Sequence, residues 1–341
     1  MTTDPDTGPT GSTNTDGPMP ALEGTRPIVG DAGNFADLEG EPAMFVNRSP
    51  DAIVDAGTFG DLVIRAAAVR GSSHRFGGTP RQDHFCLERS MGGVPCLLVA
   101  VADGVSAGPE SHLAARVATT VACEALKRQL EGDDDAPSKS IDDIDWKAVL
   151  RSAAASVVRQ AARAWGKPVD PDADIIETLS LTAGSMATTL TLGVVPATLT
   201  PGESVTAKVM EYGDSAGAAL RQGRWTPVTA VKGAGASGPV SSAVAALPYL
   251  PDDDLPVFDV VLQAGDALVL FTDGIGDAFG AGTTELALDA AQWWSTPPGR
   301  YAFAAQVDFV RRSHSDDRTA VAVWVAPSPV DDGQSPGDSP T

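Results

Sequence analysis

Four aspartates that are far apart in this sequence stand next to apolar runs of the length of a β-strand. They are Asp83, Asp103, Asp273 and Asp316. Carboxylates can be crowded together only if a cation balances their charge or if their pKa values rise. Carboxylates that converge from distant segments therefore usually enclose a hard divalent cation, which prefers oxygen ligands. The pattern predicts a carboxylate metal centre.

Two of these aspartates follow a buried strand in the same way. Residues 97–102 and 267–271 are unbroken apolar runs, which are typical of fully buried strands. The first leads into Asp103-Gly104 and the second, after one threonine, into Asp273-Gly274. Glycine lets the backbone turn and lets its carbonyl approach a ligand closely. Asp-Gly is also a common turn dipeptide, so turn chemistry alone would explain a single copy.

Further motifs accompany the aspartates in a fixed order. Gly-Ser-Ser-His (71–74) and Arg-Gln-Asp-His-Phe (81–85) lie upstream; Thr-Thr (188–189), Gly-Asp-Ser (213–215) and Ser-Asp-Asp-Arg-Thr (315–319) lie downstream. From about Val63 to Val325, this order resembles the metal-dependent PPM or PP2C-type serine/threonine phosphatases. The opening motifs are similar to the bacterial branch of that family.

The resemblance implies an activity and a set of site residues. The activity is hydrolysis of phosphoserine or phosphothreonine in a phosphorylated protein substrate, by a water that two Mg²⁺ or Mn²⁺ ions activate. Such a substrate suggests a pathway that contains a serine/threonine kinase. The implied metal ligands are Asp83, Asp103, Gly104, Asp273 and Asp316, of which Asp83 and Asp103 are the implied catalytic residues. Auxiliary positions are Gln82, Asp214 and Asp317.

The phosphate-binding position departs from the family's pattern. Many relatives place an arginine five residues before the position of Asp83, where this chain has Gly78. Arg75, Arg81 and His74 are the remaining candidates for contacting the substrate phosphate, although neither arginine is in register.

Other positions also depart from the pattern. Gln82 stands where glutamate is frequent, Val105 where animal members carry a histidine, and Asp317 where asparagine is usual. The aspartate of a third metal site would fall near Gly184, so that site is expected to be absent or built differently.

The residue types favour magnesium or manganese over zinc. Zinc sites prefer histidine and cysteine, and the sequence contains no His-x-His, His-Glu-x-x-His or Cys-x-x-Cys. Two divalent ions about 3.5–4 Å apart can activate water without a covalent nucleophile. A Gly-x-Ser-x-Gly nucleophile motif is not completed at Gly184-Ser185-Met186-Ala187, which lacks the final glycine, and the sequence contains no Gly-x-x-x-x-Gly-Lys-Ser/Thr phosphate-binding loop.

Composition limits the kinds of partner that we expect and the cellular compartment in which we expect the protein. With 45 acidic and 24 basic residues the formal net charge is −21, which argues against a nucleic-acid partner. No apolar run approaches the roughly 20 residues that cross a bilayer, and no secretory signal is recognised, so we expect no membrane partner. The three cysteines do not suggest a disulfide framework, and we expect a cytoplasmic protein.

The predicted fold is an α/β protein of the α+β type, a four-layer helix–sheet–sheet–helix sandwich with mostly antiparallel sheets. We expect a largely disordered or loosely docked segment at 1–60, one phosphatase-like domain at 61–326 and a disordered tail at 327–341. Residues 231–259 are proposed as a flap beside the metal centre. Predicted strands are 62–69, 84–87, 97–102, 187–195, 205–212, 216–221, 257–262, 267–271 and 319–325. Predicted helices are 111–130, 146–165, 284–295 and 301–313.

Two alternatives stay open at this point. The departures at Gly78, Gln82 and Val105 suit a catalytically weak or inactive pseudophosphatase, which would bind phosphoproteins as a regulatory module. The other alternative is a hydrolase of small-molecule phosphates on the same scaffold.

Overall fold

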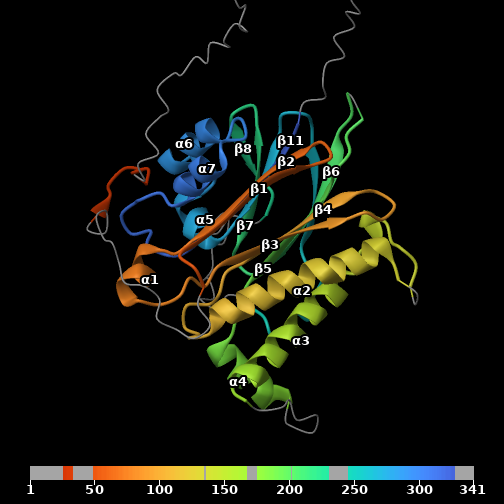
Figure 1. Cartoon of the computed structure of the whole chain (residues 1–341), viewed down its shortest axis with the longest axis vertical. Coiled ribbons are helices and arrows are strands. Elements are labelled where there is room, and N and C mark those ends of the chain that lie inside the picture. The colour runs from red at the N-terminus through yellow and green to blue at the C-terminus, as the bar shows by residue number, and fades with distance from the viewer. Residues whose placement is uncertain are drawn as a thin grey trace, which may run out of the picture.

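The chain forms two β-sheets packed face to face, with helices on both outer faces (Figure 1). The computed structural model describes residues 26–33, 49–133, 136–166, 175–200, 202–229 and 245–326. The predicted four-layer sandwich of helix, sheet, sheet and helix is confirmed. All paired strands in both sheets are antiparallel (Figure 1).

The first sheet has six strands in the spatial order β1-β2-β11-β10-β7-β8. Their bounds are Ala52–Phe59, Leu62–Val69, Arg318–Val325, Ala267–Phe271, Ala216–Arg221 and Arg224–Pro227. The last strand of the described residues, β11, thus lies between β2 and β10 in the middle of the sheet. It is buried along its whole length because helices cover one of its faces and the second sheet covers the other.

The second sheet has five strands in the order β3-β4-β5-β6-β9. They span His84–Ser90, Cys96–Ala102, Leu190–Pro196, Val205–Tyr212 and Val257–Leu262. Every residue of β4 and of β5 is buried, which explains why β4 is a continuous apolar run and why β5 contains no charged residue.

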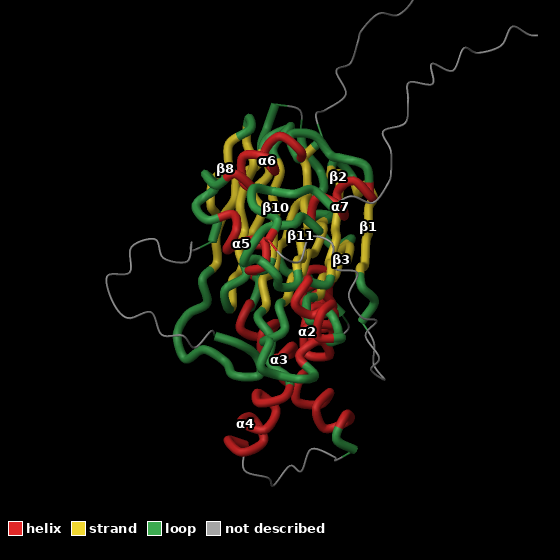
Figure 2. The backbone as a smooth tube through the Cα atoms, turned by 90° about the vertical axis from the view of Figure 1, so that its left-hand side faces the viewer, coloured by secondary structure: helices red, strands yellow, loops and turns green. Residues whose placement is uncertain are grey.

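Helices α2 (Ser111–Glu131) and α3 (Trp146–Ala164) cover the five-stranded sheet, and the short 3₁₀ turn η2 (Ile141–Asp143) lies between them. Helices α5 (Asp273–Phe279), α6 (Glu285–Trp293) and α7 (Arg300–Val307) cover the six-stranded sheet. The short helix α1 (Ser72–Gly77) follows β2. Figure 2 shows α4 (Ile175–Ser185) at the end of the molecule opposite α6.

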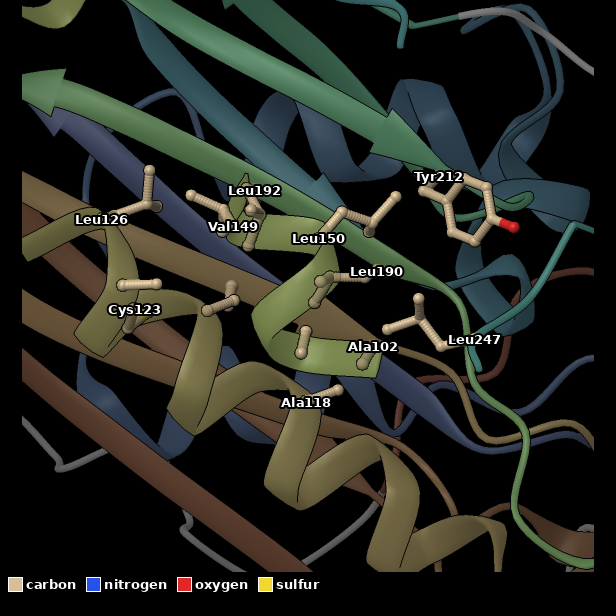
Figure 3. Packing of buried hydrophobic residues seen from close by; sticks show 14 of the residues in the cluster. Ala102, Ala118, Cys123, Leu126, Val149, Leu150, Leu190, Leu192, Tyr212 and Leu247 are labelled. Carbon is tan, nitrogen blue, oxygen red and sulfur yellow. The ribbon is translucent and has the colours of Figure 1, made fainter. Parts of the chain in front are cut away.

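Three apolar layers hold the sandwich together. One lies between α2, α3 and the five-stranded sheet, where Leu126, Val149 and Leu192 meet (Figure 3). A second, rich in aromatic residues, lies under α5–α7 and includes Phe279, Phe303 and Trp324. The third lies between the two sheets. Side chains that alternate along a strand serve two layers at once, which fixes the register of each strand.

The structure confirms most predicted elements and corrects several. The strands at 205–212, 216–221, 257–262 and 267–271 match β6, β7, β9 and β10 at both ends. The prediction missed β1, β8, α1, α4 and α5. Assignment of residues 1–60 to a loosely docked segment was wrong for 52–59, which pair with all of β2 as strand β1. Because β1 is an edge strand with most residues exposed or half-buried, it lacks an apolar pattern. The helix predicted at 301–313 ends at Val307.

Some predictions concern residues outside the described part of the chain. The tail at 327–341, residues 231–244 of the proposed flap, and most of the N-terminal segment fall there. The described part of the flap contacts the core, since Leu247 is buried and exchanges backbone hydrogen bonds with Thr188 of 3.1 and 2.8 Å. Among the described helices, none is long and apolar enough to cross a membrane.

Substituting Leu126→Ala on α2 should lower the free energy of unfolding by about 2–5 kcal/mol, because it opens a cavity in the layer beneath α2. Leu126 is 0% exposed. The matched control is Leu288→Ala on α6, where the leucine is 58% exposed; its effect should stay within about 0.5 kcal/mol. Urea unfolding monitored by circular dichroism measures both. Equal losses would contradict the assignment of α2 to a packed layer.

Candidate metal centre

The four predicted aspartates lie at the ends of neighbouring antiparallel strands. Asp83 precedes β3 and Asp103 follows β4; the two strands pair His84 with Ala102, so the aspartates share one end of the five-stranded sheet. Asp273 follows β10 and Asp316 precedes β11, and there Phe271 pairs with Ala320. Each sheet therefore contributes two carboxylates.

The two pairs meet where the sheets face each other. Burial and the charges of Asp83, Asp273 and Asp316 raise the pKa of Asp103 well above its ordinary value of 3.8. Carboxylate oxygens of Asp103, Asp214 and Asp273 all lie within 4.8 Å of one another. The structure thus brings together the four aspartates that were chosen from the sequence, and adds Asp214, which had been assigned an auxiliary position.

Asp83 is the most enclosed member of the cluster. It is 2% exposed, and the Thr272 hydroxyl donates to its Oδ2 at 2.7 Å. Thr272 in turn accepts from the backbone N–H of Thr319 at 3.0 Å, so one hydroxyl links two strands of the six-stranded sheet to a carboxylate of the five-stranded sheet. Burial and the charge of Asp317 raise the pKa of Asp83. Sequence reasoning missed Thr272, although its place directly before Asp273-Gly274 could have signalled it.

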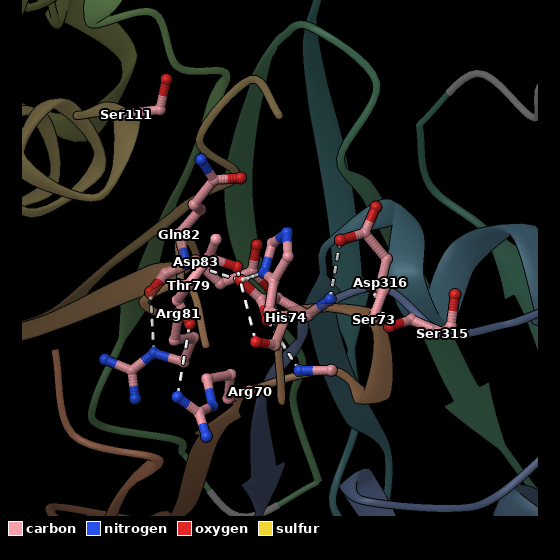
Figure 4. Close-up of polar contacts among 12 residues, drawn as sticks. Arg70, Ser73, His74, Thr79, Arg81, Gln82, Asp83, Ser111, Ser315 and Asp316 are labelled. Atoms are coloured by element: carbon pink, nitrogen blue, oxygen red, sulfur yellow. Dashed lines mark hydrogen bonds and ion pairs between the residues drawn. The ribbon is translucent and has the colours of Figure 1, made fainter. Parts of the chain in front are cut away.

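Asp317 organises the backbone around the centre. Its Oδ1 accepts from the N–H of Gly71 at 2.7 Å, and its Oδ2 accepts from the N–H of Gln82 at 2.5 Å and lies 2.8 Å from Nδ1 of His74. Figure 4 shows His74 and Asp83 side by side, with Asp316 across from them. Burial lowers the pKa of His74, but the hydrogen bond and charge of Asp317 outweigh it and raise the pKa overall.

Two threonines hold Asp103 in place. The Thr189 hydroxyl accepts from the N–H of Asp103 at 3.0 Å, while the Thr188 hydroxyl donates to the Asp103 carbonyl at 2.8 Å. Thr189 also contacts the Ser215 hydroxyl at 3.0 Å. This contact ties the Gly-Asp-Ser turn to the centre and explains why Asp214 reaches Asp103 from a different strand.

The two arginines predicted to contact phosphate have other partners. Arg81 is 1% exposed and donates to the carbonyls of Asp83 and Ala68 at 3.0 and 3.1 Å. In Figure 4 its guanidinium points away from Asp316, toward Arg70. Arg75 makes two hydrogen bonds of 3.2 Å to Asp308. Gly78, at the position where relatives carry arginine, ends α1 with φ of 62°, a conformation that favours glycine.

Gln82 is buried beside Asp83, and its side-chain amide donates to the Gly108 carbonyl at 3.1 Å.

A cavity of about 140 Å³ adjoins Asp214 on the other side of the centre. Trp225, Phe271 and Phe279 line it together with Asp277. The cavity is large enough for an amino-acid side chain.

The donor set fits hard divalent cations. Oδ1 of Asp83 is buried and has no hydrogen-bond partner within the described part of the chain. A buried carboxylate oxygen without a donor is costly unless a cation meets it. The neighbouring donors are carboxylate oxygens, which suit magnesium or manganese better than zinc.

Comparisons with known proteins agree with this chemistry. A family model described as Protein phosphatase 2C matches residues 70–306, more than half of the chain. No curated protein sequence matches the chain. Several solved structures are similar to it.

One is the PPM Ser-Thr phosphatase MsPP from Mycobacterium smegmatis, in complex with cacodylate. It is 20% identical, with 77% of this chain and 98% of that chain covered and a TM-score of 0.48. The serine/threonine phosphatase PstP/Ppp of Mycobacterium tuberculosis is 19% identical, with coverage of 80% and 100% and a TM-score of 0.46. The catalytic domain of PstP in complex with two manganese ions is 21% identical, with coverage of 78% and 98% and a TM-score of 0.45.

Substituting Gly274→Ala should lower the free energy of unfolding by about 1–3 kcal/mol and weaken Mn²⁺ binding. A Cβ at Gly274 would lie 1.9 Å from the carbonyl oxygen of Asp317, so the loop that carries Asp316 would have to move. Chemical unfolding and calorimetric titration with Mn²⁺ measure the two effects.

The control on the same helix is Gly276→Ala, whose Cβ would meet Phe271 at an ordinary 3.4 Å. This substitution should be neutral or stabilise the protein by up to about 1 kcal/mol. If both variants lost similar amounts of unfolding free energy and Mn²⁺ affinity, the close approach of α5 to the Asp317 backbone would not be the cause of the loss.

In metal-free protein, Asp103→Asn should become increasingly more stable than the wild type as pH rises. Because the folded-state pKa of Asp103 is raised, folding favours its protonated form. That contribution is fully present below the ordinary value of 3.8 and is lost as pH rises through the folded-state pKa. The difference in unfolding free energy should grow by up to about 1.4 kcal/mol per pH unit.

Urea unfolding in EDTA at a series of pH values measures this difference. Comparing two proteins at each pH cancels the contributions of groups that do not interact with Asp103, such as His84, whose pKa burial lowers to about 4. Excess Mn²⁺ should reverse the order, because the cation stabilises the wild type more. A difference that is independent of pH would refute the raised pKa.

Proposed function

Because the chain belongs to the protein phosphatase 2C family, we propose that it is a metal-dependent phosphatase that hydrolyses phosphoserine and phosphothreonine in proteins. The single observation that carries this proposal is the convergence of Asp83, Asp103, Asp273 and Asp316 from both sheets, with a buried oxygen of Asp83 that lacks a donor among the described residues. A scaffold that brings four carboxylates together at one point is suited to bind cations.

The proposed ligands of two Mg²⁺ or Mn²⁺ ions are Asp83, Asp103, Asp273 and Asp316, together with the carbonyl of Gly104. Asp214 is an auxiliary ligand, since its carboxylate lies within 4.8 Å of those of Asp103 and Asp273. When bound, such ions lower the pKa of coordinated water and offset the negative charge of a phosphoryl group.

The chain's own residues position these ligands. Thr272 orients Asp83, Thr188 and Thr189 fix the backbone of Asp103, and Asp317 joins α1 to the loop before β3. Preorganised ligands of this kind need no rearrangement when cation and substrate bind.

Of the three residues proposed to contact substrate phosphate, His74 is the best placed. It sits on Asp317 beside the carboxylates, and its side chain is 14% exposed. The contacts of Arg75 and Arg81 favour structural roles for both, so we keep His74 for the phosphate and assign the arginines to support of the loop. The substrate we propose is a phosphorylated protein, which implies a serine/threonine kinase that produces it.

A pseudophosphatase is the second candidate, and a specific observation favours it. At the position where relatives carry the phosphate-binding arginine, Gly78 closes α1 in a left-handed conformation, and the two nearby arginines are committed elsewhere. A site without a guanidinium for the phosphate would bind phosphoproteins and turn them over slowly.

Purified protein should hydrolyse p-nitrophenyl phosphate and a phosphothreonine peptide with Mn²⁺ or Mg²⁺, and EDTA should stop both reactions. Asp103→Asn and Asp273→Asn should each lower kcat/KM by about 100-fold or more, since charge stabilisation by a bound cation is worth several kcal/mol. Steady-state release of nitrophenol and phosphate measures the effect.

Asp253→Asn, at an exposed position, is the control and should leave the activity unchanged. No release from folded, Mn²⁺-loaded protein that still binds the phosphopeptide would transfer the proposal to the pseudophosphatase. Hydrolysis that persists in both variants would reject the metal centre.

A further inference from the structure

A small basic cavity lies beyond the loop that carries Asp316, on the side of α1 and residues 26–33. Its volume is about 40 Å³. Arg26, Arg311, Arg318 and His314 line it together with hydroxyls that include Ser72 and Ser315. No carboxylate is among the lining residues that the structure describes. This is unusual in a protein whose formal net charge is −21.

Two guanidiniums at this cavity have N–H groups without an acceptor among the described residues. Arg318 is 2% exposed; its Nη2 donates to the carbonyl of His314 and its plane stacks on Phe309 at 4.4 Å. Among the described residues, neither Nε of Arg318 nor Nη1 of Arg311 has a hydrogen-bond partner, although both atoms are buried. Buried donors of charged groups are costly when left unpaired, so an unmet pair of this kind indicates a ligand.

The nearby carboxylates are engaged elsewhere. Asp308 accepts two hydrogen bonds from Arg75 and lies 3.6 Å from Arg26. Asp31 pairs with Arg312 at 3.0 Å on the surface. In the described part of the chain no ion pair reaches Arg311 or Arg318. Water in the cavity would supply acceptors, whereas an anion would supply acceptors and also balance positive charge.

The walls of the cavity are held by backbone pairing. Residues 26–33 run alongside 309–312, with Val29 donating to Val310 at 2.9 Å, Val310 to Pro27 at 2.7 Å and Arg312 to Asp31 at 2.6 Å. The opposite wall is tied to α1, because the N–H and the hydroxyl of Ser73 both donate to the carbonyl of Ser315, at 2.9 and 2.7 Å.

We propose that this cavity is an anion site, separate from the carboxylate cluster, for a single oxyanion of the size of phosphate. Guanidinium donors and serine hydroxyls are the groups that recognise phosphate oxygens. A water molecule needs about 10–15 Å³ of such volume, so the cavity holds about three water molecules or one tetrahedral oxyanion, and excludes nucleotides. The same chemistry would accept free inorganic phosphate or the phosphate of a phosphorylated serine side chain.

The test is calorimetric titration of metal-free, full-length protein in EDTA at constant ionic strength, with inorganic phosphate as the probe. EDTA removes the cations of the carboxylate cluster, which then repels anions, so the result does not depend on catalysis. We expect saturable binding, and Arg311→Gln should raise the Kd at least tenfold. Arg312→Gln makes the same charge change at the neighbouring exposed residue, and should alter the Kd less than twofold.

Absence of binding to the wild type, or an unchanged Kd for Arg311→Gln, would overturn the proposal and leave the cavity to water. Should Arg311→Gln fail to fold, Arg311→Lys keeps the charge but loses the fork of donors, and it should still weaken binding at least threefold. A phosphoserine peptide that competes with inorganic phosphate would identify a phosphorylated side chain as the ligand. Binding of inorganic phosphate alone would identify the free ion.

Discussion

The mutual repulsion of crowded carboxylates is the constraint around which this molecule is arranged. Asp83, Asp103, Asp273 and Asp316 are close enough that each adds to the cost of ionising another, and burial adds further to that cost. A chain can hold such a cluster only if a cation balances the charge or the pKa values rise, and only if the surrounding structure is stiff enough to keep the carboxylates together. Two fully hydrogen-bonded sheets, packed through three apolar layers, supply the stiffness.

The carboxylate cluster also lies where side-chain contacts join the two sheets. Thr272, at the end of β10, donates to Asp83 at the start of β3, and Asp317, before β11, accepts from the N–H of Gln82. These contacts join segments that are more than 180 residues apart in sequence. Residues that support the site therefore also support the docking of the sheets, so that stability and function are not separable here. Asp317 shows this most clearly, since it binds α1, His74 and the loop before β3 at once.

Much of the fold could be predicted because the buried strands β4, β5 and β10 read as apolar runs, and the long helices α2 and α3 carry a clear periodicity. Elements without that pattern were missed: β1 and β8 are mostly exposed or half-buried, and α5 begins inside an Asp-Gly motif that reads as a turn. The order of motifs located the aspartates. The roles of Arg75 and Arg81 could not be predicted, because Arg75 bonds to Asp308 and Arg81 bonds to backbone carbonyls, and no local sequence pattern identifies these partners. The same holds for Thr272 and for the basic cavity around Arg311.

The position of β11 determines when the molecule can fold. This strand is the last described element of the chain, yet it lies in the interior of the six-stranded sheet between β2 and β10. During synthesis, β2 therefore has no inner neighbour until some 250 further residues have been made. Asp316 and Asp317 arrive with β11, so the nascent chain also cannot complete the carboxylate cluster before that point. Pairing of such distant strands carries a large loop-closure entropy and makes folding slow. Until β11 docks, the apolar faces of both sheets are without their final partner, and that interval is when the chain most needs protection by chaperones.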